Sequence, residues 1–477
     1  MANLTMLTDL YQLTMMYGYY QEGVHETEAV YDVFFRKTAG ESGYAIAAGL
    51  EQVIDYINNL HFDEEDISYL RSLHLFSEDF FDYLKGLRFT GEIYAIPEGT
   101  VVFPYEPLIR VKAKIIEAQL VETAILNIVN HQTLIATKAS RVVYAAQGDT
   151  VLEFGLRRAQ GPDAGLYGAR AAMIGGCHAT SNVLAGQRFA VPVAGTHAHS
   201  WIMSFPSELE AFRAYAREFP DSCLLLVDTY DTLKSGVPNA IRVFRELKEA
   251  GHTPLGIRLD SGDLAYLSKM ARQMLDEAGF PEAKICASSD LDEQIIRELK
   301  QQEACIDTWG VGTKLITSEN CPALGGVYKL AAREVDGALE PKIKISDNIW
   351  KITNPGYKKL VRIYGKSTGK AIADLIMLEE EEIDENAPLT IFDPNETWKR
   401  TTISNFTTKE LLVPIFQEGK QVYQSPAVMD IRAFAQEDLN TFWNEYRRFT
   451  RPHIYKVDLS DGLWQLKQNM IRSERQE

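Results

Sequence analysis

The 477-residue chain lacks several features that would assign it to a specialised class of protein. Its five cysteines are odd in number and form no C-x-x-C pair, which favours reduced, mostly buried thiols over a disulfide framework. No stretch is apolar enough to cross a bilayer, and the N-terminus has neither the basic nor the apolar region of a secretory signal. We therefore expect a cytoplasmic protein.

The chain is also short of positive charge. It carries 49 Lys and Arg against 66 Asp and Glu, a formal net charge of −17. An acidic surface repels nucleic acid and anionic lipid, so neither is an expected partner. Any anionic substrate must be held by a local cluster of Arg, Lys and backbone N–H groups. The length favours two or three domains, and 45% hydrophobic residues suffice for a large core.

The first third of the chain predicts helices followed by a small sheet. Residues up to about Asp82 have a helical pattern, most clearly in 50–60 and 63–75. From 89 to 116, short alternating runs broken by prolines predict a small antiparallel sheet. Residues 117–147 predict a long buried helix. Together these segments form a predicted α+β N-terminal domain, 1–148.

From residue 150 onward, short apolar runs recur about every 30 residues, with helical stretches such as 208–219, 237–250 and 264–279 between most of them. Continuous apolar strands that alternate with helices predict a parallel sheet covered on its faces. Seven units favour an irregular (β/α) barrel, with an open doubly wound sheet as the alternative. The predicted strands are 151–154, 191–194, 223–227, 254–257, 284–287, 305–309 and 326–330.

The acidic run 378–386 predicts a surface loop or a domain boundary. We accordingly expect a barrel domain at 149–377. The remaining residues, 378–477, with aromatic side chains around 434–455, are expected to pack as a helical C-terminal extension.

Polar residues follow most of the apolar runs. These segments are G-L-R-R after 154, G-T-H-A-H-S after 194, D-T-Y-D after 227, R-L-D-S-G-D after 257 and G-V-G-T after 309. The carboxyl ends of parallel strands open onto one face of a barrel, so these groups are expected to converge there.

Each of these groups also has a structural interpretation. Arg157 and its neighbour Arg158 are suited to surface ion pairs. Asp228 and Asp260 are suited to capping helices, although Asp263, directly before an apolar helix, is the better cap.

The G-x-G of Gly310 and Gly312 is compatible with a simple tight turn. Because Thr313 and Lys314 follow it, the turn also offers N–H groups, a hydroxyl and a cation to a sugar phosphate.

The His-x-His pair, His197 and His199, raises the alternative of a zinc site, which requires further ligands at later strand ends. The only later histidines are His252, before its strand, and His453, near the C-terminus. The metal set is therefore incomplete. An unliganded His199 beside a phosphate-binding face is better suited as a nucleophile or charge partner, and His197 as a structural residue.

In this order, T-D-L-Y-Q-L-T-M-M, F-G-L-R-R, A-G-T-H-A-H-S, V-D-T-Y-D, I-R-L-D-S-G-D and W-G-V-G-T closely resemble the nicotinate phosphoribosyltransferase family. The resemblance runs from the N-terminus to about residue 375, without departure at the motif positions. It implies the type II phosphoribosyltransferase fold, in which an irregular barrel is joined to a smaller N-terminal domain. It also implies a head-to-tail homodimer with active sites at the subunit interface.

The resemblance further implies roles for individual residues. Nicotinate would lie between Phe154 and Tyr11 of the partner subunit, near Thr196, with Arg258 matched to its carboxylate. At Ser181, nicotinamide-using relatives carry an acidic residue, which would repel a carboxylate. The substrate-binding set implied by the family is Tyr11, Phe154, Arg157, Ser181, Thr196 and Arg258.

For catalysis, the resemblance implies that ATP phosphorylates His199 and thereby drives the transfer. Asp228 and Asp260 would hold the ribose hydroxyls and, through water, Mg²⁺. The 5-phosphate of phosphoribosyl pyrophosphate would be cradled by Gly310, Gly312, Thr313, Gly326 and Lys329.

Three alternatives remain open at the level of sequence. Nicotinamide or quinolinate phosphoribosyltransferase activity belongs to the same class. A sugar-phosphate aldolase or isomerase needs a Schiff-base lysine or a base at a strand end, and the strand ends offer no lysine before Lys314 and Lys329. A catalytically inactive dimeric scaffold would have no reason to keep the polar strand ends.

Overall fold

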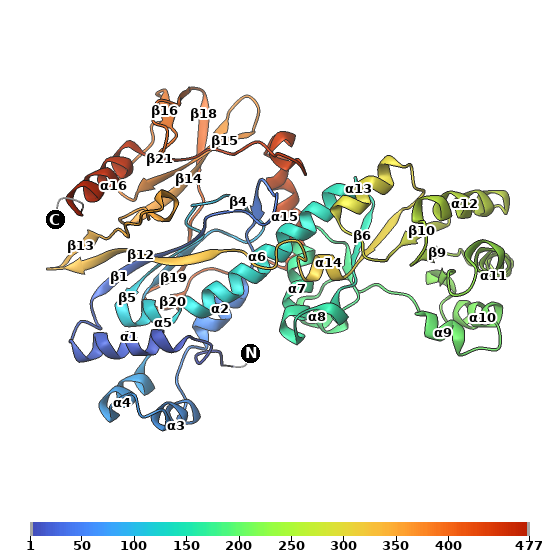
Figure 1. The fold of residues 1–477 in the computed structure, drawn as a ribbon, viewed down its shortest axis with the longest axis horizontal. Coiled ribbons are helices and arrows are strands. Elements are labelled where there is room, and N and C mark those ends of the chain that lie inside the picture. Colours follow the sequence, from blue (N-terminus) through green and yellow to red (C-terminus); the bar gives the residue numbers. More distant parts are fainter. Residues whose placement is uncertain (1–2, 475–477) are drawn as a thin grey trace. The chain divides into compact units, whose positions relative to one another are not determined.

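A computed structural model describes residues 3–474 of the chain. By contacts the chain divides into two compact units, residues 1–134 with 323–477, and residues 135–322 (Figure 1). The chain passes from the first unit to the second within the long helix α6 (Glu122–Ala145). This division differs from the three consecutive domains 1–148, 149–377 and 378–477, whose boundaries stay a prediction.

The second unit is built on a six-stranded parallel sheet in the order β7-β6-β11-β10-β9-β8. Its strands are β6 (Thr150–Glu153), β7 (Ala179–Thr180), β8 (Leu224–Leu226), β9 (Gly256–Leu259), β10 (Lys284–Ala287) and β11 (Thr308–Val311). Five of them match predicted strands to within a few residues. The two-residue β7 was not predicted, since so short a run has no periodicity to detect.

The extended segment 191–197 joins the two edges of this sheet. Val193 forms a parallel bridge with Thr180 of β7, and the Ala194 N–H donates to the Thr180 carbonyl over 3.0 Å. On the other edge, the Thr196 hydroxyl donates to the Leu224 carbonyl of β8 (2.6 Å). The sheet is therefore an irregular barrel, as predicted, and not an open doubly wound sheet.

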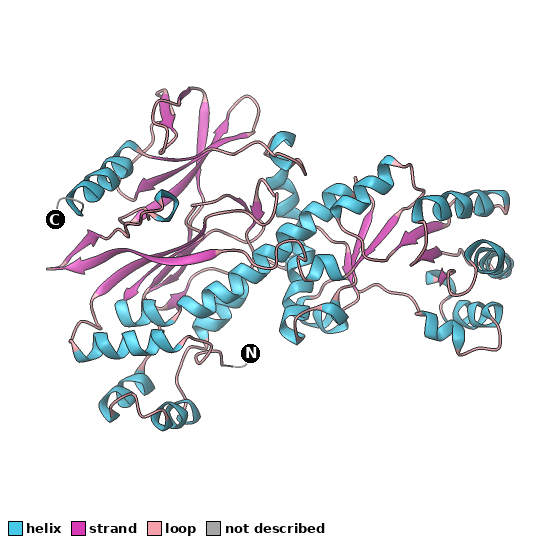
Figure 2. Ribbon diagram, in the orientation of Figure 1, coloured by secondary structure: helices cyan, strands magenta, loops and turns pink. Residues whose placement is uncertain are grey.

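Helices alternate with the barrel strands (Figure 2). They form because apolar residues recur at helical spacing; in α11, for example, Ala240, Val243, Phe244 and Leu247 are buried. The three predicted helices are confirmed. The helices are α7 (Pro162–Ile174), α8 (Val183–Phe189), α9 (His199–Met203), α10 (Glu208–Glu218), α11 (Val237–Glu249), α12 (Leu264–Glu277), α13 (Glu293–Gln301) and α14 (Thr313–Ile316), with the short turns η1 (Leu156–Arg158), η2 (Pro220–Ser222) and η3 (Thr232–Gly236).

The first unit contains a seven-stranded sheet in the order β13-β12-β1-β5-β3-β19-β20, with antiparallel pairing throughout. Its strands are β1 (Glu28–Phe35), β3 (Glu92–Ala95), β5 (Ile109–Lys114), β12 (Gly326–Val335), β13 (Ala338–Pro341), β19 (Val413–Gln417) and β20 (Lys420–Gln421). The antiparallel sheet predicted in 89–116 is confirmed by β3 and β5, together with the short pair β2 (Ala45–Ile46) and β4 (Val101–Val102).

Two predictions about this unit are wrong. The region before Asp82 is not all helical, because β1 is a strand in which all residues after Glu28 are buried. A strand buried on both faces loses the alternation by which strands are recognised. The run 326–330 is not a barrel strand but part of β12, antiparallel to β1. The helices before α6 are α1 (Leu10–Gln21), α2 (Leu50–Asn58), α3 (Glu64–Ser72), α4 (Glu78–Gly86) and α5 (Ile115–Leu120).

The C-terminal portion was predicted as a helical layer, and this is wrong in its detail. Within the described residues, six strands, two α-helices and one 3-10 turn follow residue 378: β16 (Leu389–Phe392), β17 (Arg400–Ile403), β18 (Phe406–Glu410), β19, β20, β21 (Val457–Leu459), α15 (Val428–Asn440), α16 (Asp461–Glu474) and η5 (Asn444–Arg447). A second sheet has the order β18-β14-β15-β21, with β14 (Lys358–Gly365) and β15 (Ala371–Leu378) at its centre. The aromatic residues in this part of the sequence show that it is hydrophobic, but their spacing has neither helical nor strand periodicity.

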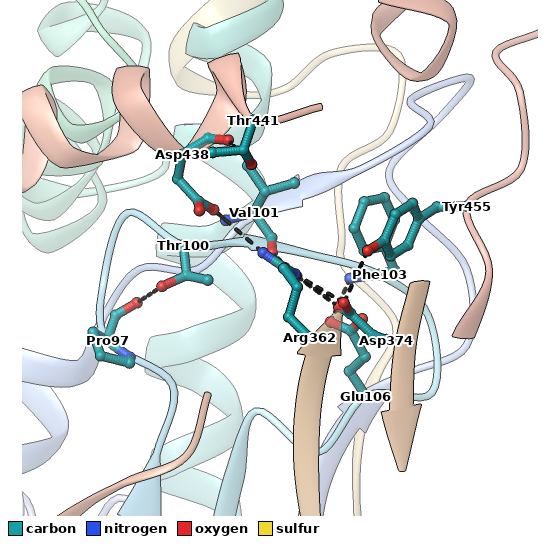
Figure 3. Close-up of polar contacts among 10 residues, drawn as sticks. All are labelled: Pro97, Thr100, Val101, Phe103, Glu106, Arg362, Asp374, Asp438, Thr441 and Tyr455. Atoms are coloured by element: carbon teal, nitrogen blue, oxygen red, sulfur yellow. Dashed lines mark hydrogen bonds and ion pairs between the residues drawn. The ribbon is translucent and has the colours of Figure 1, made fainter. Parts of the chain in front are cut away.

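A buried ionic cluster ties these C-terminal elements to the N-terminal part of the same unit (Figure 3). The fully buried Arg362 guanidinium binds both oxygens of Asp374, with Nη2 2.6 Å from Oδ2, and donates to the Val101 carbonyl over 2.7 Å. The Tyr455 hydroxyl donates to Asp374, and Asp438 lies 3.4 Å from Arg362 Nη1. Arg362 and both aspartates are thus paired, while burial and the charge of Asp374 raise the pKa of Glu106, the further carboxyl in Figure 3. The cluster therefore links these segments.

Candidate active site at the strand ends

Two carboxylates lie side by side where neighbouring strands β8 and β9 end. Asp228 Oδ2 accepts hydrogen bonds from the Asp260 N–H (2.8 Å) and from the Ser261 hydroxyl (2.6 Å). Asp228 Oδ1 is buried and has no hydrogen-bond partner among the described residues. Neither aspartate caps a helix; Asp263 does so, accepting from the Tyr266 N–H at 3.0 Å. Both aspartates are therefore left to contact a ligand.

Arg258 points from β9 toward the same strand ends. Its Nη2 donates to Asp260 Oδ1 (3.0 Å) and its Nε to the Ser288 hydroxyl (2.9 Å). Burial raises the pKa of the Asp260 carboxyl, but hydrogen bonding from Ser288 and the charge of Arg258 outweigh it and hold that pKa below its ordinary value. Asp260 is therefore an anion at neutral pH and fixes the guanidinium beside it.

His199 begins α9 and faces the carboxylates. Its Nε2 lies 3.7 Å from Asp260 Oδ2, and its Nδ1 lies 3.1 Å from the Thr229 hydroxyl. The side chain is 41% exposed, so a ligand can reach the ring. His197 is different: it is buried and accepts a hydrogen bond from the Leu226 N–H, and burial lowers its pKa to about 4. His197 is thus a neutral structural residue, as predicted.

Phe154 follows β6 and packs against Gly310 and Gly312. Gly310 lies within β11, paired with Leu152, and Gly312 follows the end of that strand, so the two glycines do not form a simple turn. A Cβ added to Gly310 would meet Cδ2 and Cε2 of the Phe154 ring at 2.7 Å, and one added to Gly312 would lie 3.3 Å from the Phe154 carbonyl oxygen. The centre of the Arg258 guanidinium lies 5.8 Å from the ring centroid. The structure thus brings an aromatic face and a cation together, and the glycines make room for the ring.

The remaining predicted residues of this unit lie at the same strand ends. Ser181 follows β7 and donates its N–H to the Glu153 carbonyl (3.0 Å). The Thr196 hydroxyl donates to the Leu224 carbonyl of β8, in the contact that closes the barrel. Arg157 lies exposed in η1, which contacts α14.

Thr313 begins α14, and no acceptor or donor partner for its hydroxyl occurs in the described part of the chain. Lys314, which the sequence offered as a phosphate-binding cation, instead pairs with the buried Asp292 (3.1 Å). Lys314 is therefore not a free cation at this strand end.

Three predicted residues belong to the other compact unit. Tyr11 lies in α1 and is 48% exposed beside the exposed Leu7, Leu10 and Met15. Burial and the charges of Glu122 and Asp9 raise the pKa of the Tyr11 hydroxyl. Gly326 begins β12, where a Cβ would meet Asn130 Oδ1 at 2.1 Å. Burial lowers the pKa of Lys329, whose ammonium donates to the Tyr328 carbonyl (2.8 Å).

Two residues of the site escaped the sequence reasoning. Ser288, at the end of β10, binds both Arg258 and Asp260, and Thr229 binds His199. The sequence S-S-D after β10 is the same kind of polar strand end as the others, and it was available as a signal. Thr229 lies in the polar segment D-T-Y-D after β8, but nothing in that segment singles out the threonine as a partner of His199.

The fold and these side chains define a class of protein. A barrel whose strand ends gather two carboxylates, an arginine, a histidine, an aromatic face and a pair of glycines is an enzyme architecture that binds a small anionic ligand. Among the described residues no three His, Cys, Asp or Glu form a metal-binding group, and none of the helices there has the length and apolarity to span a membrane.

Comparison with known proteins identifies the family. Models of the nicotinate phosphoribosyltransferase N-terminal domain, the nicotinate phosphoribosyltransferase family and the nicotinate phosphoribosyltransferase C-terminal domain match residues 6–130, 150–383 and 357–467. The chain is 51% identical over 469 residues to nicotinate phosphoribosyltransferase of Bacillus subtilis, covering 98% of this chain and 95% of that protein. The chain belongs to the nicotinate phosphoribosyltransferase family.

More distant relatives agree. The nicotinate phosphoribosyltransferase of Caenorhabditis elegans is 38% identical, covering 96% of this chain and 92% of its own. The crystal structure of human nicotinic acid phosphoribosyltransferase is similar with a TM-score of 0.85 and 31% identity, covering 98% of this chain and 100% of that one. A nicotinate-nucleotide pyrophosphorylase from Pyrococcus furiosus, 22% identical with a TM-score of 0.71, shares the fold. The type II phosphoribosyltransferase fold expected from the sequence is confirmed.

Proposed function

We propose that the protein transfers the phosphoribosyl group of phosphoribosyl pyrophosphate to nicotinate, giving nicotinate mononucleotide and pyrophosphate in NAD salvage. The observation that carries the proposal is the meeting of Arg258, Asp260, Asp228 and His199 at adjacent ends of one parallel sheet. This set offers a cation to a carboxylate and anionic oxygens to a sugar, which are the two halves of such a substrate pair. The protein would act in the cytoplasm.

In this proposal the nicotinate ring stacks on Phe154 and its carboxylate binds Arg258. The guanidinium forms a planar fork that matches a carboxylate, and the Phe154 ring offers a flat apolar surface to a heterocycle. Ser181 and Thr196 line the same strand ends without adding negative charge. Since nicotinamide has no carboxylate, the Arg258 fork favours the acid.

Tyr11 supplies the second aromatic face from a partner subunit. The proposal is supported by the exposed apolar residues near Tyr11 in the sequence: Leu10 and Met15 in α1, and Leu7 just before it. Exposed apolar residues gathered in this way are typical of protein interfaces. A homodimer with shared active sites follows from this proposal. Gly310, Gly312 and Thr313 would form the part of the site that binds the 5-phosphate.

Mg²⁺ fits the carboxylate pair. The buried Asp228 Oδ1 has no protein partner among the described residues, and Mg²⁺ prefers one or two carboxylates together with water and substrate phosphates. Asp228 and Asp260 would hold the ion through water, and the ion would neutralise charge on the pyrophosphate. The same two residues also orient the ribose hydroxyls.

His199 is the proposed site of phosphorylation by ATP. If Nδ1 donates its proton to the Thr229 hydroxyl, Nε2 keeps its lone pair and lies at the exposed strand ends, 3.7 Å from Asp260 Oδ2. Nε2 attacks the γ-phosphorus of ATP, the bond to ADP breaks, and the phosphoryl group stays on the ring until water removes it. The free energy of that hydrolysis drives the transfer toward mononucleotide.

The transfer itself requires no general base, because the pyridine nitrogen of nicotinate has a free lone pair at neutral pH. The difficult step is cleavage of the C1–O bond to pyrophosphate, through a transition state with oxocarbenium character. The protein contributes by orienting the ring with Arg258 and Phe154 and by placing the negative Asp228 and Asp260 near the developing cation. This accounts for a site rich in fixed charges with no acid–base pair.

A substrate panel tests the proposal. The purified protein is incubated with phosphoribosyl pyrophosphate, Mg²⁺ and either nicotinate, nicotinamide or quinolinate, with and without ATP, and nucleotide products are separated by chromatography. We expect a nucleotide product from nicotinate alone, namely nicotinate mononucleotide, formed faster and further with ATP. Product from nicotinamide or quinolinate in preference to nicotinate would contradict the proposed substrate, and no product with any of them would contradict the activity.

A further inference from the structure

Ser288 is the one side chain that contacts both Arg258 and Asp260 in the described part of the chain. It follows β10 and is 4% exposed, and its N–H donates to the Leu259 carbonyl of β9 over 2.9 Å. The serine backbone is therefore tied to the strand that carries Arg258. Its position relative to the guanidinium is fixed by main-chain hydrogen bonding and not by side-chain packing alone.

The Ser288 hydroxyl joins the two charged groups. Its oxygen accepts from Arg258 Nε at 2.9 Å, and its proton is donated to Asp260 Oδ1. Asp260 Oδ1 also accepts from Arg258 Nη2 at 3.0 Å. Arg258, Asp260 and Ser288 thus form a closed ring of three hydrogen bonds, with a polar partner for each group.

This ring decides which edge of the guanidinium is open. The Nε edge is occupied by Ser288, and one proton of Nη2 by Asp260. The protons left over are both on Nη1 and one on Nη2, and no acceptor for Nη1 occurs among the described residues. These form the end-on fork that binds a carboxylate with two parallel hydrogen bonds.

Without the hydroxyl, nothing would keep Nε away from Asp260. An arginine and a carboxylate prefer to pair through two parallel hydrogen bonds, and Asp260 would then accept from both Nε and Nη2 of Arg258. The guanidinium would rotate, and its open fork would no longer face the ligand. We propose that Ser288 is a positioning residue that holds Arg258 apart from full pairing with Asp260, so that its Nη1–Nη2 fork recognises the carboxylate of nicotinate. This inference rests on the proposed function.

The test is a comparison of two Michaelis constants in one variant. In Ser288→Ala we expect the KM for nicotinate to rise roughly 10- to 100-fold, the loss typical of a hydrogen bond to a charged group. The KM for phosphoribosyl pyrophosphate should rise less, because its 5-phosphate would bind at Gly312 and Thr313 and only its ribose and Mg²⁺ would contact Asp260. A general loss of packing would move both constants together.

Two further variants keep the result interpretable. Ser268→Ala is the matched control: Ser268 is also fully buried, and its hydroxyl binds only backbone groups, the Ala265 carbonyl and the Cys305 N–H. Ser288→Cys retains the volume of serine but is a weak hydrogen-bonding group, and it decides the question if Ser288→Ala does not fold. Thermal unfolding of all variants is measured alongside.

A nicotinate KM that rises more than the phosphoribosyl pyrophosphate KM in Ser288→Ala or Ser288→Cys, and not in Ser268→Ala, supports the role. An equal rise of both constants, or a nicotinate KM like that of Ser268→Ala, overturns it. These results are separable from failure of the proposed function, since in that case the unmutated protein itself would form no nicotinate mononucleotide.

Discussion

Gly310 should tolerate no side chain, because the Phe154 ring lies where a Cβ would be. In Gly310→Ala the new methyl group would meet two ring carbons at 2.7 Å, so the ring must retreat by about 0.7 Å to reach ordinary contact. Overpacking of this kind costs about 1–3 kcal/mol of stability. Since Phe154 is only half-buried, its ring can move, and the lower end of that range is expected.

The effect on activity should exceed the effect on stability. Displacement of a substrate-positioning group by about 1 Å can cost up to roughly 100-fold in rate. We therefore expect kcat/KM for nicotinate to fall about 10- to 100-fold, equivalent to about 1.4–2.7 kcal/mol of transition-state stabilisation. The assay is steady-state formation of nicotinate mononucleotide, with urea unfolding of the same protein.

Two controls isolate the ring as the cause. Gly86→Ala places a methyl group where no atom lies within 4 Å, and it should leave activity and stability nearly unchanged. The double variant Gly310→Ala with Phe154→Leu removes ring atoms at the point of contact. It should regain stability without regaining activity. The reasoning is refuted if Gly310→Ala alone retains wild-type kcat/KM for nicotinate.

Three further predictions concern single residues. His199→Ala should abolish labelling of the protein by [γ-³²P]ATP while some ATP-independent transfer survives; a labelled variant would contradict the assignment. His197 has its pKa lowered by burial from 6.5 to about 4, so the unfolded state binds more protons in that interval. Stability should therefore fall by up to about 3 kcal/mol as pH drops from about 6.5 to 4, and less in His197→Gln, as urea unfolding at each pH will show. Asp374→Asn leaves Arg362 buried without its full partner and should cost about 3–5 kcal/mol; an unchanged urea midpoint would mean that the cluster does not fix the packing.

The barrel was predictable because its strands and helices repeat with a regular spacing, and strands such as 284–287 fall within continuous apolar runs. The convergence of Asp228, Arg258 and Asp260 followed from the rule that parallel strands end on one face. The predictions failed for strands whose own sequence shows no alternation of apolar and polar residues. The strand β1 is buried on both faces, and β12 pairs with it across about 300 residues of chain. The sequence of either segment alone does not show with which distant segment it pairs.

The site shows the same limit. Sequence reasoning identified charged residues at strand ends, but not the hydroxyl of Ser288 that joins two of them, because such a role depends on distances between strands. It also took Lys314 as a free cation, and the structure pairs it with Asp292, which caps α13. Which cation is left for a ligand is decided by its neighbours in space.

The central claim is that residues from separate strand ends form one site, and equilibrium binding of nicotinate mononucleotide tests it most directly. This ligand carries the pyridine carboxylate, the ribose and the 5-phosphate together, so it fills both halves of the site. Calorimetric titration should show affinity reduced about tenfold or more in each of Arg258→Ala, Asp228→Ala and Thr313→Ala, but not in Ser268→Ala. Wild-type affinity in all three strand-end variants would contradict the account.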